Sequence, residues 1–248
     1  MHTNEFGQPV GRPVAGWTPR PPFAPVVLTG RTCRLEPAGP QHTDRLHQAL
    51  DVDSDPVIWA YYPQGPYADP AALGAWVADL DRSPTSAPFA ILDPDGRALG
   101  IASYLRIDPP NGSIEVGGIV MSSALQRTTA STEAMYLMMR HVFDDLGYRR
   151  YEWKCDSTNA PSRRAAGRLG FSYEGTFRNA VVYRGRNRDT DWYSITDDEW
   201  PAIRAELERW LDPRNFDADG TQRTRLDTAA ALGGPRPVSP QDVSAQDR

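Results

Sequence analysis

Small hydroxyl side chains gather where the sequence passes from a loop into a helix. Thr128, Thr129, Ser131 and Thr132 lie close together just before an apolar helical pattern. A helix N-terminus presents unpaired backbone N–H groups and a partial positive charge, which together suit a phosphate or another anion. The same residue types are also common helix caps. The sequence leaves both interpretations open at this point, plain capping and anion binding.

A second candidate is a pair of glycines inside a strand-like run. Gly117 and Gly118 interrupt the apolar stretch Ser113–Met121. Two glycines in the middle of a strand commonly mark a bulge or a close approach of backbone. A bulge would leave a backbone N–H group unpaired beside the helix that begins near Thr128. We therefore expect a binding site between this strand and that helix.

An aromatic loop is the third feature that could take part in chemistry. The segment 59–67 carries Trp59, Tyr61, Tyr62 and Tyr67, and two prolines and a glycine restrict its backbone. Such a loop can pack under the domain. It can also form one wall of a substrate pocket, since functional loops carry aromatic residues on a rigid scaffold. Both interpretations stay open.

The elements that position these residues follow from hydrophobic periodicity. Apolar residues recur with helical spacing within Leu125–Gly147, and Gly147 is a natural helix end. Arg149–Asp156 then alternates, with Tyr151, Trp153 and Cys155 on one face. A strand that follows a helix that follows a strand is expected to lie parallel to the first strand, here Ser113–Met121. Cys155 is therefore predicted to be a buried core thiol.

The remaining elements complete a mixed α/β (α+β) fold in which a mostly antiparallel sheet is flanked by helices. A strand pair or one bent strand is expected at Val26–Glu36, helices at Gln41–Leu50, Asp69–Leu80, Asn159–Leu169 and Asp197–Leu211, antiparallel strands at Pro88–Leu92 and Leu99–Ile107, and a hairpin formed by Phe171–Arg184 and Asn187–Thr196. Residues 1–24 are expected to form an extended arm that packs on the domain through Trp17, and residues 25–213 are expected to form one domain. Residues 214–248 are expected to form a polar tail, disordered from about residue 226.

Composition excludes several classes of function. The 248 residues are 40% hydrophobic and 24% charged, and the net charge of −5 argues against a broad nucleic-acid surface. Two cysteines make no disulfide framework, and no Cys/His spacing predicts a metal site. The sequence shows no signal peptide and no run long enough to span a bilayer. We expect a cytoplasmic protein that binds neither nucleic acid nor membrane.

Four motifs in order resemble the GNAT acyltransferase superfamily, and most closely the branch of the ribosomal-protein N-terminal acetyltransferases. The resemblance spans roughly Val26–Leu211. Its most specific part is the run from Asn159 and Ser162 to Leu169-Gly170-Phe171. The motifs are Leu125-Gln126-Arg127-Thr128-Thr129-Ala130-Ser131-Thr132-Glu133-Ala134, Glu152-Trp153-Lys154-Cys155-Asp156, Asn159-Ala160-Pro161-Ser162-Arg163-Arg164-Ala165-Ala166 and Arg168-Leu169-Gly170-Phe171-Ser172-Tyr173-Glu174-Gly175.

The resemblance implies transfer of an acetyl group from acetyl-CoA to an amine by direct attack, without a metal, across a splayed pair of parallel strands. In that family the phosphate loop has a glycine where this sequence has Thr129, which is a departure, whereas Gln126 fits the pattern. A histidine found in part of the branch at the position of Gly118 is also absent. The residues implied to bind the coenzyme are Gln126, Arg127, Thr128, Thr129, Ala130, Ser131, Thr132, Asn159, Ser162 and Arg164, with backbone N–H groups of Ile119, Val120 and Met121 beside the thioester.

Two side chains are the candidates for proton transfer. Glu115 is placed on the glycine-broken strand and could accept the proton of the amine. Ser162, by its position in the motif, could donate a hydrogen bond or proton to the leaving thiolate.

The acceptor entrance is expected, from the resemblance, between the aromatic loop and the hairpin. Trp59, Tyr61, Tyr62, Asp189 and Asp191 would then line it. The aspartates favour a cationic amine, such as a protein N-terminus or a small molecule. Four arginines of the hairpin, Arg178, Arg184, Arg186 and Arg188, favour an acidic acceptor or acyl group. A solvated hairpin with internal ion pairs is the third possibility and the one that the sequence favours, whereas the sequence does not rank the other two.

Two rival functions use the same scaffold. One is a transferase for another donor such as succinyl-CoA, and the other is a non-catalytic module that binds an acyl-CoA. The resemblance also makes a homodimer a possibility.

Overall fold

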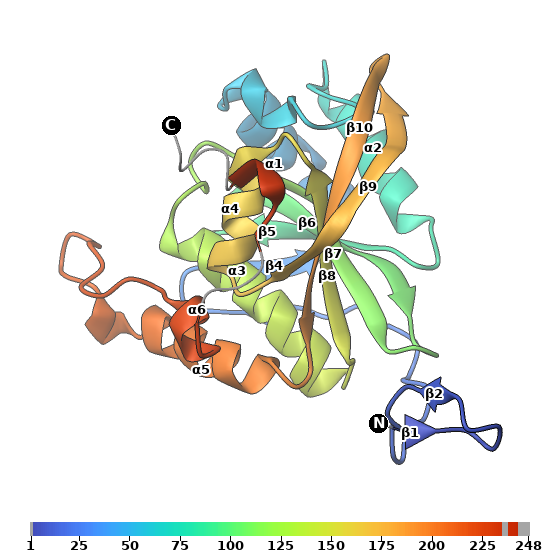
Figure 1. The fold of residues 1–248 in the computed structure, drawn as a ribbon. Coiled ribbons are helices and arrows are strands. Elements are labelled where there is room, and N and C mark those ends of the chain that lie inside the picture. The colour runs from blue at the N-terminus through green and yellow to red at the C-terminus, as the bar shows by residue number, and fades with distance from the viewer. Residues whose placement is uncertain (1, 235–237, 243–248) are drawn as a thin grey trace.

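An eight-stranded sheet forms the centre of the molecule, with strands in the order β3-β4-β5-β6-β7-β8-β10-β9 (Figure 1). The computed structural model describes residues 2–234 and 238–242. Neighbouring strands run antiparallel except β7 and β8, which pair parallel as the sequence predicted. The fold is therefore mixed α/β, with a mostly antiparallel sheet flanked by helices, as expected.

The bounds of the elements are as follows. The strands are β1 His2–Thr3, β2 Pro9–Val10, β3 Leu28–Thr29, β4 Arg34–Pro37, β5 Ala87–Leu92, β6 Ala98–Asp108, β7 Ser113–Met121, β8 Arg150–Asp156, β9 Ser172–Tyr183 and β10 Arg186–Thr196. The helices are α1 Thr43–His47, α2 Pro70–Asp81, α3 Thr129–Arg140, α4 Ala160–Arg168, α5 Trp200–Leu211 and α6 Thr228–Ala231. No helix within these described residues is long and apolar enough to cross a membrane.

The two faces of the sheet are covered by different helices. Along β5, Phe89 and Ile91 pack into a cluster with α3 and α5, whereas Ala90 and Leu92 pack into a second cluster with α1 and α2. This alternation is the ordinary consequence of the two-residue period of a strand. Figure 1 shows α3 and α4 in front of the sheet, with α1 and α2 on its other side.

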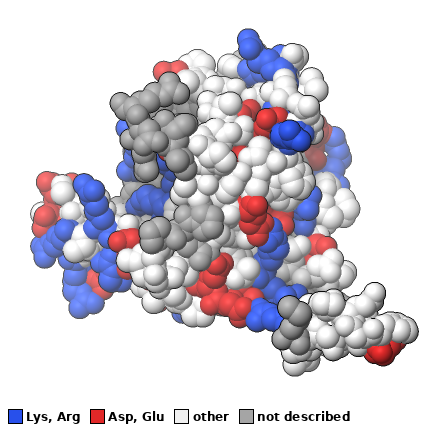
Figure 2. Space-filling view, viewed as in Figure 1, with Lys and Arg blue, Asp and Glu red and all other residues white. Residues whose placement is uncertain are grey.

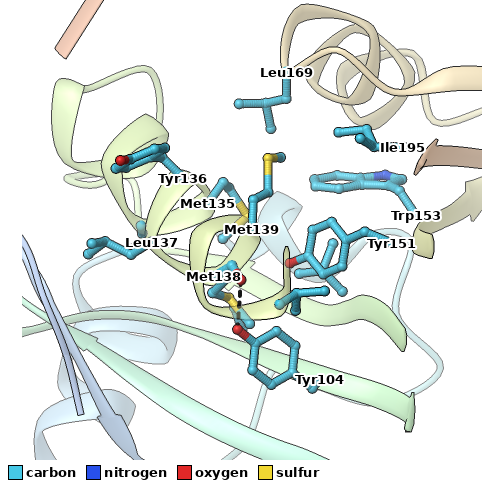
Figure 3. Packing of buried hydrophobic residues seen from close by; sticks show 14 of the residues in the cluster. Tyr104, Met135, Tyr136, Leu137, Met138, Met139, Tyr151, Trp153, Leu169 and Ile195 are labelled. Atoms are coloured by element: carbon cyan, nitrogen blue, oxygen red, sulfur yellow. Dashed lines mark hydrogen bonds between the residues drawn. The ribbon is translucent and has the colours of Figure 1, made fainter. Parts of the chain in front are cut away.

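Helix α3 is buried on all sides through its middle turns. Every residue from Thr132 to Met139 is buried, although the sequence predicted only one apolar stripe. The hydroxyl of Tyr104 in β6 donates to the carbonyl oxygen of Met138 at 2.9 Å. Figure 3 shows this bond and the packing of Met135, Met138 and Met139 against the sheet. The dense packing fixes the direction of the helix and therefore the place of its N-terminus.

Glu133 ties the first turns of α3 to the turn between β3 and β4. Its carboxylate accepts from the backbone N–H of Arg31 at 2.9 Å and from that of Thr32 at 2.6 Å. Gly30 has no room for a side chain, because a Cβ atom there would lie 2.6 Å from Cδ of Glu133. Charge-assisted bonds to backbone N–H groups are among the stronger polar contacts in proteins.

The N-terminal segment contacts the domain through the indole of Trp17, the backbone N–H of Arg20, which donates to the carbonyl oxygen of Pro109 at 2.9 Å, and the ring of Phe23, which packs edge-on against Tyr104. Its β1–β2 hairpin projects from the body of the molecule (Figure 1). Trp17 donates from Nε1 to the carbonyl oxygen of Pro110 at 3.0 Å and covers Gly112. The guanidinium groups of Arg20 and Arg149 lie 4.3 Å and 5.3 Å from the centre of its ring. The expected packing through Trp17 is present, and the small hairpin before it was not predicted.

The C-terminal segment makes contacts where the sequence predicted disorder. Thr228 in α6 is buried and donates to the carbonyl oxygen of Arg168 at 3.2 Å. Asp242 accepts from Nε and Nη2 of Arg163 at 3.0 Å and 2.8 Å. The structure therefore differs from the expectation in residues 226–234 and 238–242, while the rest of the predicted disordered segment lies outside the described residues.

Candidate active site

Strands β7 and β8 separate half-way along their length. Their parallel pairing runs from Ser113 opposite Arg150 to Val116 opposite Trp153 and ends there. The bulge that the glycines predicted follows at once. Ser103 in β6 pairs with Gly117 and Ile101 pairs with Val120, so two residues of β7 stand opposite one residue of β6.

Gly118 and Ile119 are the two residues of β7 that form the bulge. Gly118 has a φ of +56°, in the left-handed region that favours glycine. Neither Gly118 nor Ile119 has a paired residue in β6 or β8 within the described strands. These two residues are thus outside the strand pairing, next to the point where β7 and β8 separate.

The bulge also reverses which face of the sheet the side chains occupy. Before it, Ile114 and Val116 pack into the cluster around α3, whereas after it Val120 packs into the cluster under α1 and α2. Ile119 and Met121 accordingly lie against the α3 cluster. Before the bulge the even-numbered residues of β7 face α3. After it, within the segment 119–121 that is expected beside the thioester, the odd-numbered residues face α3.

The N-terminus of α3 lies at the end of the same strand. Thr128 caps the helix, because its hydroxyl oxygen accepts from the backbone N–H of Ser131 at 3.2 Å. Within the described part of the chain, the backbone N–H groups of Arg127, Thr129 and Ala130 have no hydrogen-bond acceptor. Capping and anion binding are therefore compatible, since the cap satisfies one N–H group and leaves others free.

The departure from glycine at Thr129 does not strain the backbone. The left-handed residue of this loop is Arg127, with a φ of +62°, whereas Thr129 is the first residue of the helix. Thr129 is half-exposed, so its hydroxyl group lies at the same helix end as its N–H group.

Two other residues of the expected phosphate loop have partners within the protein. The Gln126 amide donates to the carbonyl oxygen of Met121 at 3.0 Å and braces the loop against the end of β7. The hydroxyl of Thr132 is buried and accepts from Nη1 of Arg168 at 3.0 Å, which joins α3 to α4.

Helix α4 begins beside the separated end of β8. Asn159 caps it, accepting from the backbone N–H of Ser162 at 3.1 Å. Ser162 in turn accepts a hydrogen bond at Oγ from Nε1 of Trp153, at 3.0 Å. Because the indole can only donate, the hydroxyl proton of Ser162 points elsewhere. Arg164, two residues further along, is exposed.

Cys155 lies in the same region of β8 and is buried as predicted. Burial raises the pKa of its thiol to about 12. A thiol with a raised pKa is a poor nucleophile at neutral pH. This supports the interpretation of Cys155 as a core residue.

Glu115 faces away from α3, in a network of alternating charges. Its Oε2 lies 2.5 Å from Nζ of Lys154 and 3.8 Å from Nε of Arg106. Arg106 also approaches Glu152, which stands opposite Glu115 on β8. Burial raises the pKa of Glu115 above the ordinary value, and Lys154 opposes that rise.

A hollow of about 330 Å³ exposes this network on the face opposite α3. It is lined by Leu105, Arg106, Glu115 and Lys154 and by residues at the end of α2 and after it. Gly117 leaves room for the buried carboxylate on the same strand, because a Cβ atom there would lie 3.0 Å from Oε1 of Glu115. Glu115 thus stands between this hollow and the bulge.

Glu115 was expected from the sequence, whereas its partners were not. Lys154 is the only lysine of the chain, a signal that the sequence offered. Arg106 has a φ of +51° in an irregular part of β6, which aims its side chain at Glu115 and at the ring of Trp192. No local pattern indicates that placement.

The aromatic loop and the β9–β10 hairpin meet over the end of β8. Trp59 is 1% exposed and packs edge-on against Tyr62. The half-exposed Tyr61 donates to the carbonyl oxygen of Thr158 at 3.3 Å. From the tip of the hairpin, Nη2 of Arg184 donates to the carbonyl oxygen of Gly65 at 2.5 Å. Trp59 therefore packs inside the domain, whereas Tyr61 lies at the surface, where the wall of a substrate pocket was expected.

The two aspartates of the hairpin are engaged within it. Asp189 accepts from the backbone N–H of Asn179 at 2.7 Å and from the amide of Asn187 at 2.9 Å. Asp191 is fully buried and accepts from the hydroxyl of Thr176 at 2.6 Å. Internal contacts in this hairpin were one of the three possibilities open from the sequence.

Comparison with known proteins places these features in one family. The family model described as an acetyltransferase (GNAT) domain matches residues 33–172. The crystal structure of a GCN5-related N-acetyltransferase from Brucella melitensis is 43% identical, with a TM-score of 0.83 over 86% of this chain and 97% of that one. An uncharacterized N-acetyltransferase, p20, of Bacillus licheniformis is 26% identical over 59% of this chain and 84% of its own length.

A more distant structure agrees in fold. The ribosomal-protein-S5-alanine acetyltransferase from Vibrio fischeri is 17% identical, with a TM-score of 0.58 over 71% of this chain and 98% of that one.

Proposed function

Because the chain belongs to the GNAT acetyltransferase family, we propose that it transfers an acetyl group from acetyl-CoA to a primary amine by direct attack. The observation that carries the proposal is the separation of β7 from β8 at the bulge, beside the free N–H groups at the start of α3. The acceptor is a small molecule or a protein N-terminus. The coenzyme supplies the acetyl group as a thioester, and the residues of the chain bind, orient and move protons.

The phosphates are assigned to the N-terminus of α3. The backbone N–H groups of Arg127, Thr129 and Ala130 are free to donate, and the helix end favours negative charge. The hydroxyls of Thr129 and Ser131 stand at the same end, and the exposed guanidinium groups of Arg127 and Arg164 add positive charge. We give Gln126, Thr128 and Thr132 the part of shaping this end through their internal bonds.

The reacting groups are assigned to the opening between the strands. Backbone N–H groups at Ile119, Val120 and Met121 are the proposed donors to the carbonyl oxygen, where negative charge develops. As the N–C bond forms and the C–S bond breaks, the amine proton passes to the carboxylate of Glu115. The thiolate receives a hydrogen bond or proton from the hydroxyl of Ser162, which Trp153 orients. Asn159 holds the first turn of α4 in place.

The test begins with calorimetric titration of acetyl-CoA, free CoA and succinyl-CoA, followed by release of free thiol in the presence of a panel of amines. Binding of acetyl-CoA with amine-dependent thiol release would support the proposal. Binding without release in any combination would favour a non-catalytic acyl-CoA-binding module. Failure of all three ligands to bind would overturn the assignment of the phosphate site.

A further inference from the structure

The hairpin carries charges of both signs, and the structure distributes them unequally. Its aspartates, Asp189 and Asp191, are held by bonds within the hairpin. Arg178 and Arg186 are exposed, and Arg184 donates to carbonyl oxygens of the aromatic loop. Figure 2 shows basic side chains at the far end of the hairpin, at the top of the view. The charged groups of the hairpin that remain available to a ligand are therefore arginines.

Arg188 is the member of this group that lies inward. It is half-buried on β10, and its Nε atom donates to the hydroxyl of Thr190 at 3.2 Å. Among the described residues no carboxylate lies within ion-pair distance of it. By contrast, Arg106, Arg150 and Lys154 on the nearby strands each have a carboxylate partner. A partly desolvated cation without a partner is unfavourable unless a ligand supplies the partner.

The surroundings of Arg188 place it at the acceptor side of the proposed site. Thr190 pairs with Asp156 at the end of β8, beyond the point where β7 and β8 separate. Burial raises the pKa values of Tyr62 in the loop and Tyr183 in β9, and the positive charge of Arg188 acts against both rises. The guanidinium therefore lies between the loop, the hairpin and the end of β8.

We propose that Arg188 binds a carboxylate of a substrate, so that this enzyme acts on an acid. With Nε held by Thr190, the two Nη atoms remain for a planar, bidentate contact of the kind that arginine makes with carboxylates. The carboxylate belongs either to the acceptor or to a dicarboxylic acyl group such as succinyl. The inference rests on the proposed function and adds the chemical class of its substrate.

The experiment compares matched acidic and neutral partners in two arms. In the acceptor arm, Ala-Glu and Ala-Gln are compared as amines with acetyl-CoA as donor. In the donor arm, succinyl-CoA and butyryl-CoA are compared with one common amine. We expect the acidic member to be preferred in kcat/KM by about tenfold or more in one arm, since a bond to a charged group is worth ~1.5–3 kcal/mol. The arm that shows the preference identifies the source of the carboxylate.

Variants connect the preference to one side chain. In Arg188→Gln the preference should fall close to unity, and Arg188→Lys should keep only part of it. Arg186→Gln is the matched control, because it removes the same charge from an exposed position two residues away on the same strand. Thermal unfolding establishes that each variant is folded. An equal loss of the preference for the acidic partner in Arg186→Gln would show that the overall positive charge of the hairpin causes it. That result would overturn the inference.

A binding measurement separates this inference from the proposed function. Calorimetry with the products N-acetyl-Ala-Glu and N-acetyl-Ala-Gln, and with the two acyl-CoA donors, needs no turnover. Equal affinity for the acidic and neutral members in both pairs would overturn the role of Arg188 even if transfer occurs. Absence of transfer together with an acid preference in binding would instead count against the proposed function alone.

Discussion

The hydroxyl of Ser162 lies between the indole of Trp153 and the thiol of Cys155, and this defines what it can do. Its oxygen accepts the indole N–H of Trp153, while its backbone N–H is held by Asn159. An oxygen that already accepts a bond keeps its own proton for a different acceptor. The arrangement suits donation to a sulfur atom that gains negative charge.

Replacement of Ser162 by Ala should lower kcat while leaving coenzyme binding intact. We expect a loss of about 100-fold in kcat, the lower end of the range for positioned proton donors. The dissociation constant of acetyl-CoA, measured by calorimetry, should change by less than about twofold, because the cap at Asn159 uses the backbone. An unchanged kcat would show that Ser162 is a structural residue of α4.

The pH dependence should report Glu115. Because burial raises its pKa, the basic form appears only above a higher pH than for an exposed glutamate, and the acidic limb of the kcat/KM profile should lie there. Glu115→Gln should abolish that limb. Glu152→Gln should move it to lower pH, since the charge of Glu152 contributes to the raised pKa of Glu115. If both variants keep the wild-type profile, another group accepts the proton.

At the scale of elements, one bulge explains why odd-numbered residues of β7 lie on opposite faces of the sheet before and after it. Glu115 faces the hollow before the bulge, and Ile119 faces the α3 cluster after it. A regular strand would send alternate residues to the same faces throughout its length. The inserted residue therefore places the side chains of Glu115 and Ile119 on opposite faces of the sheet.

Gly118→Ala should disturb the bulge, whereas Gly167→Ala should stabilise the protein. Alanine at the φ of Gly118 costs about 1–2 kcal/mol, and its Cβ would lie 3.1 Å from the buried Oγ of Ser103. Gly167 lies in α4 with open space around it, so alanine there should add about 0.5–1 kcal/mol. Urea unfolding measures both, and kcat/KM should fall only for Gly118→Ala. Equal stability of the two variants would contradict the strain assigned to the bulge.

The sequence predicted the elements better than the contacts between distant parts. The alternation of β8, the cap at Asn159 and the glycine bulge depend on neighbouring residues, so local patterns reveal them. The bond from Arg184 to Gly65 and the ion pair of Arg163 with Asp242 join segments far apart in the chain. No local pattern encodes them, and only the assembled structure shows that no carboxylate of the described residues pairs with Arg188.

The buried polar residues of α3 are a second feature that local sequence patterns did not reveal. Thr132 and Glu133 are polar, and the apolar stripe left them on an exposed side. In the structure both are buried, because Arg168 and the β3–β4 turn supply their partners. Periodicity detects the face that contacts the sheet, and it does not detect polar faces that other elements cover.

At the scale of the whole molecule, the N-terminal arm should be held mainly by Trp17. Trp17→Ala removes the ring that covers Gly112 and the bond to Pro110. We expect the backbone N–H of Arg20, which donates to the carbonyl oxygen of Pro109, to exchange its hydrogen with solvent about tenfold faster, since the loss of a packed aromatic anchor is worth ~1.5–3 kcal/mol. Phe6→Ala is the control, because Phe6 is 77% exposed. Exchange at the same rate in the wild-type protein and in both variants would show that other contacts retain the arm.

The ion pair of Lys154 with Glu115 has a consequence for chemical durability. A thioester donor slowly acylates free amines in its surroundings, yet this chain carries a single lysine among its 27 basic side chains, and arginine stays protonated and unreactive. That one ammonium group is held by Glu115 under the ring of Trp192. Intact-mass measurement after long incubation with excess acetyl-CoA should find no adduct on Lys154 in the folded protein, and peptide mapping should find one after unfolding in urea. A protein built in this way can work in a high concentration of its own reagent without being modified by it.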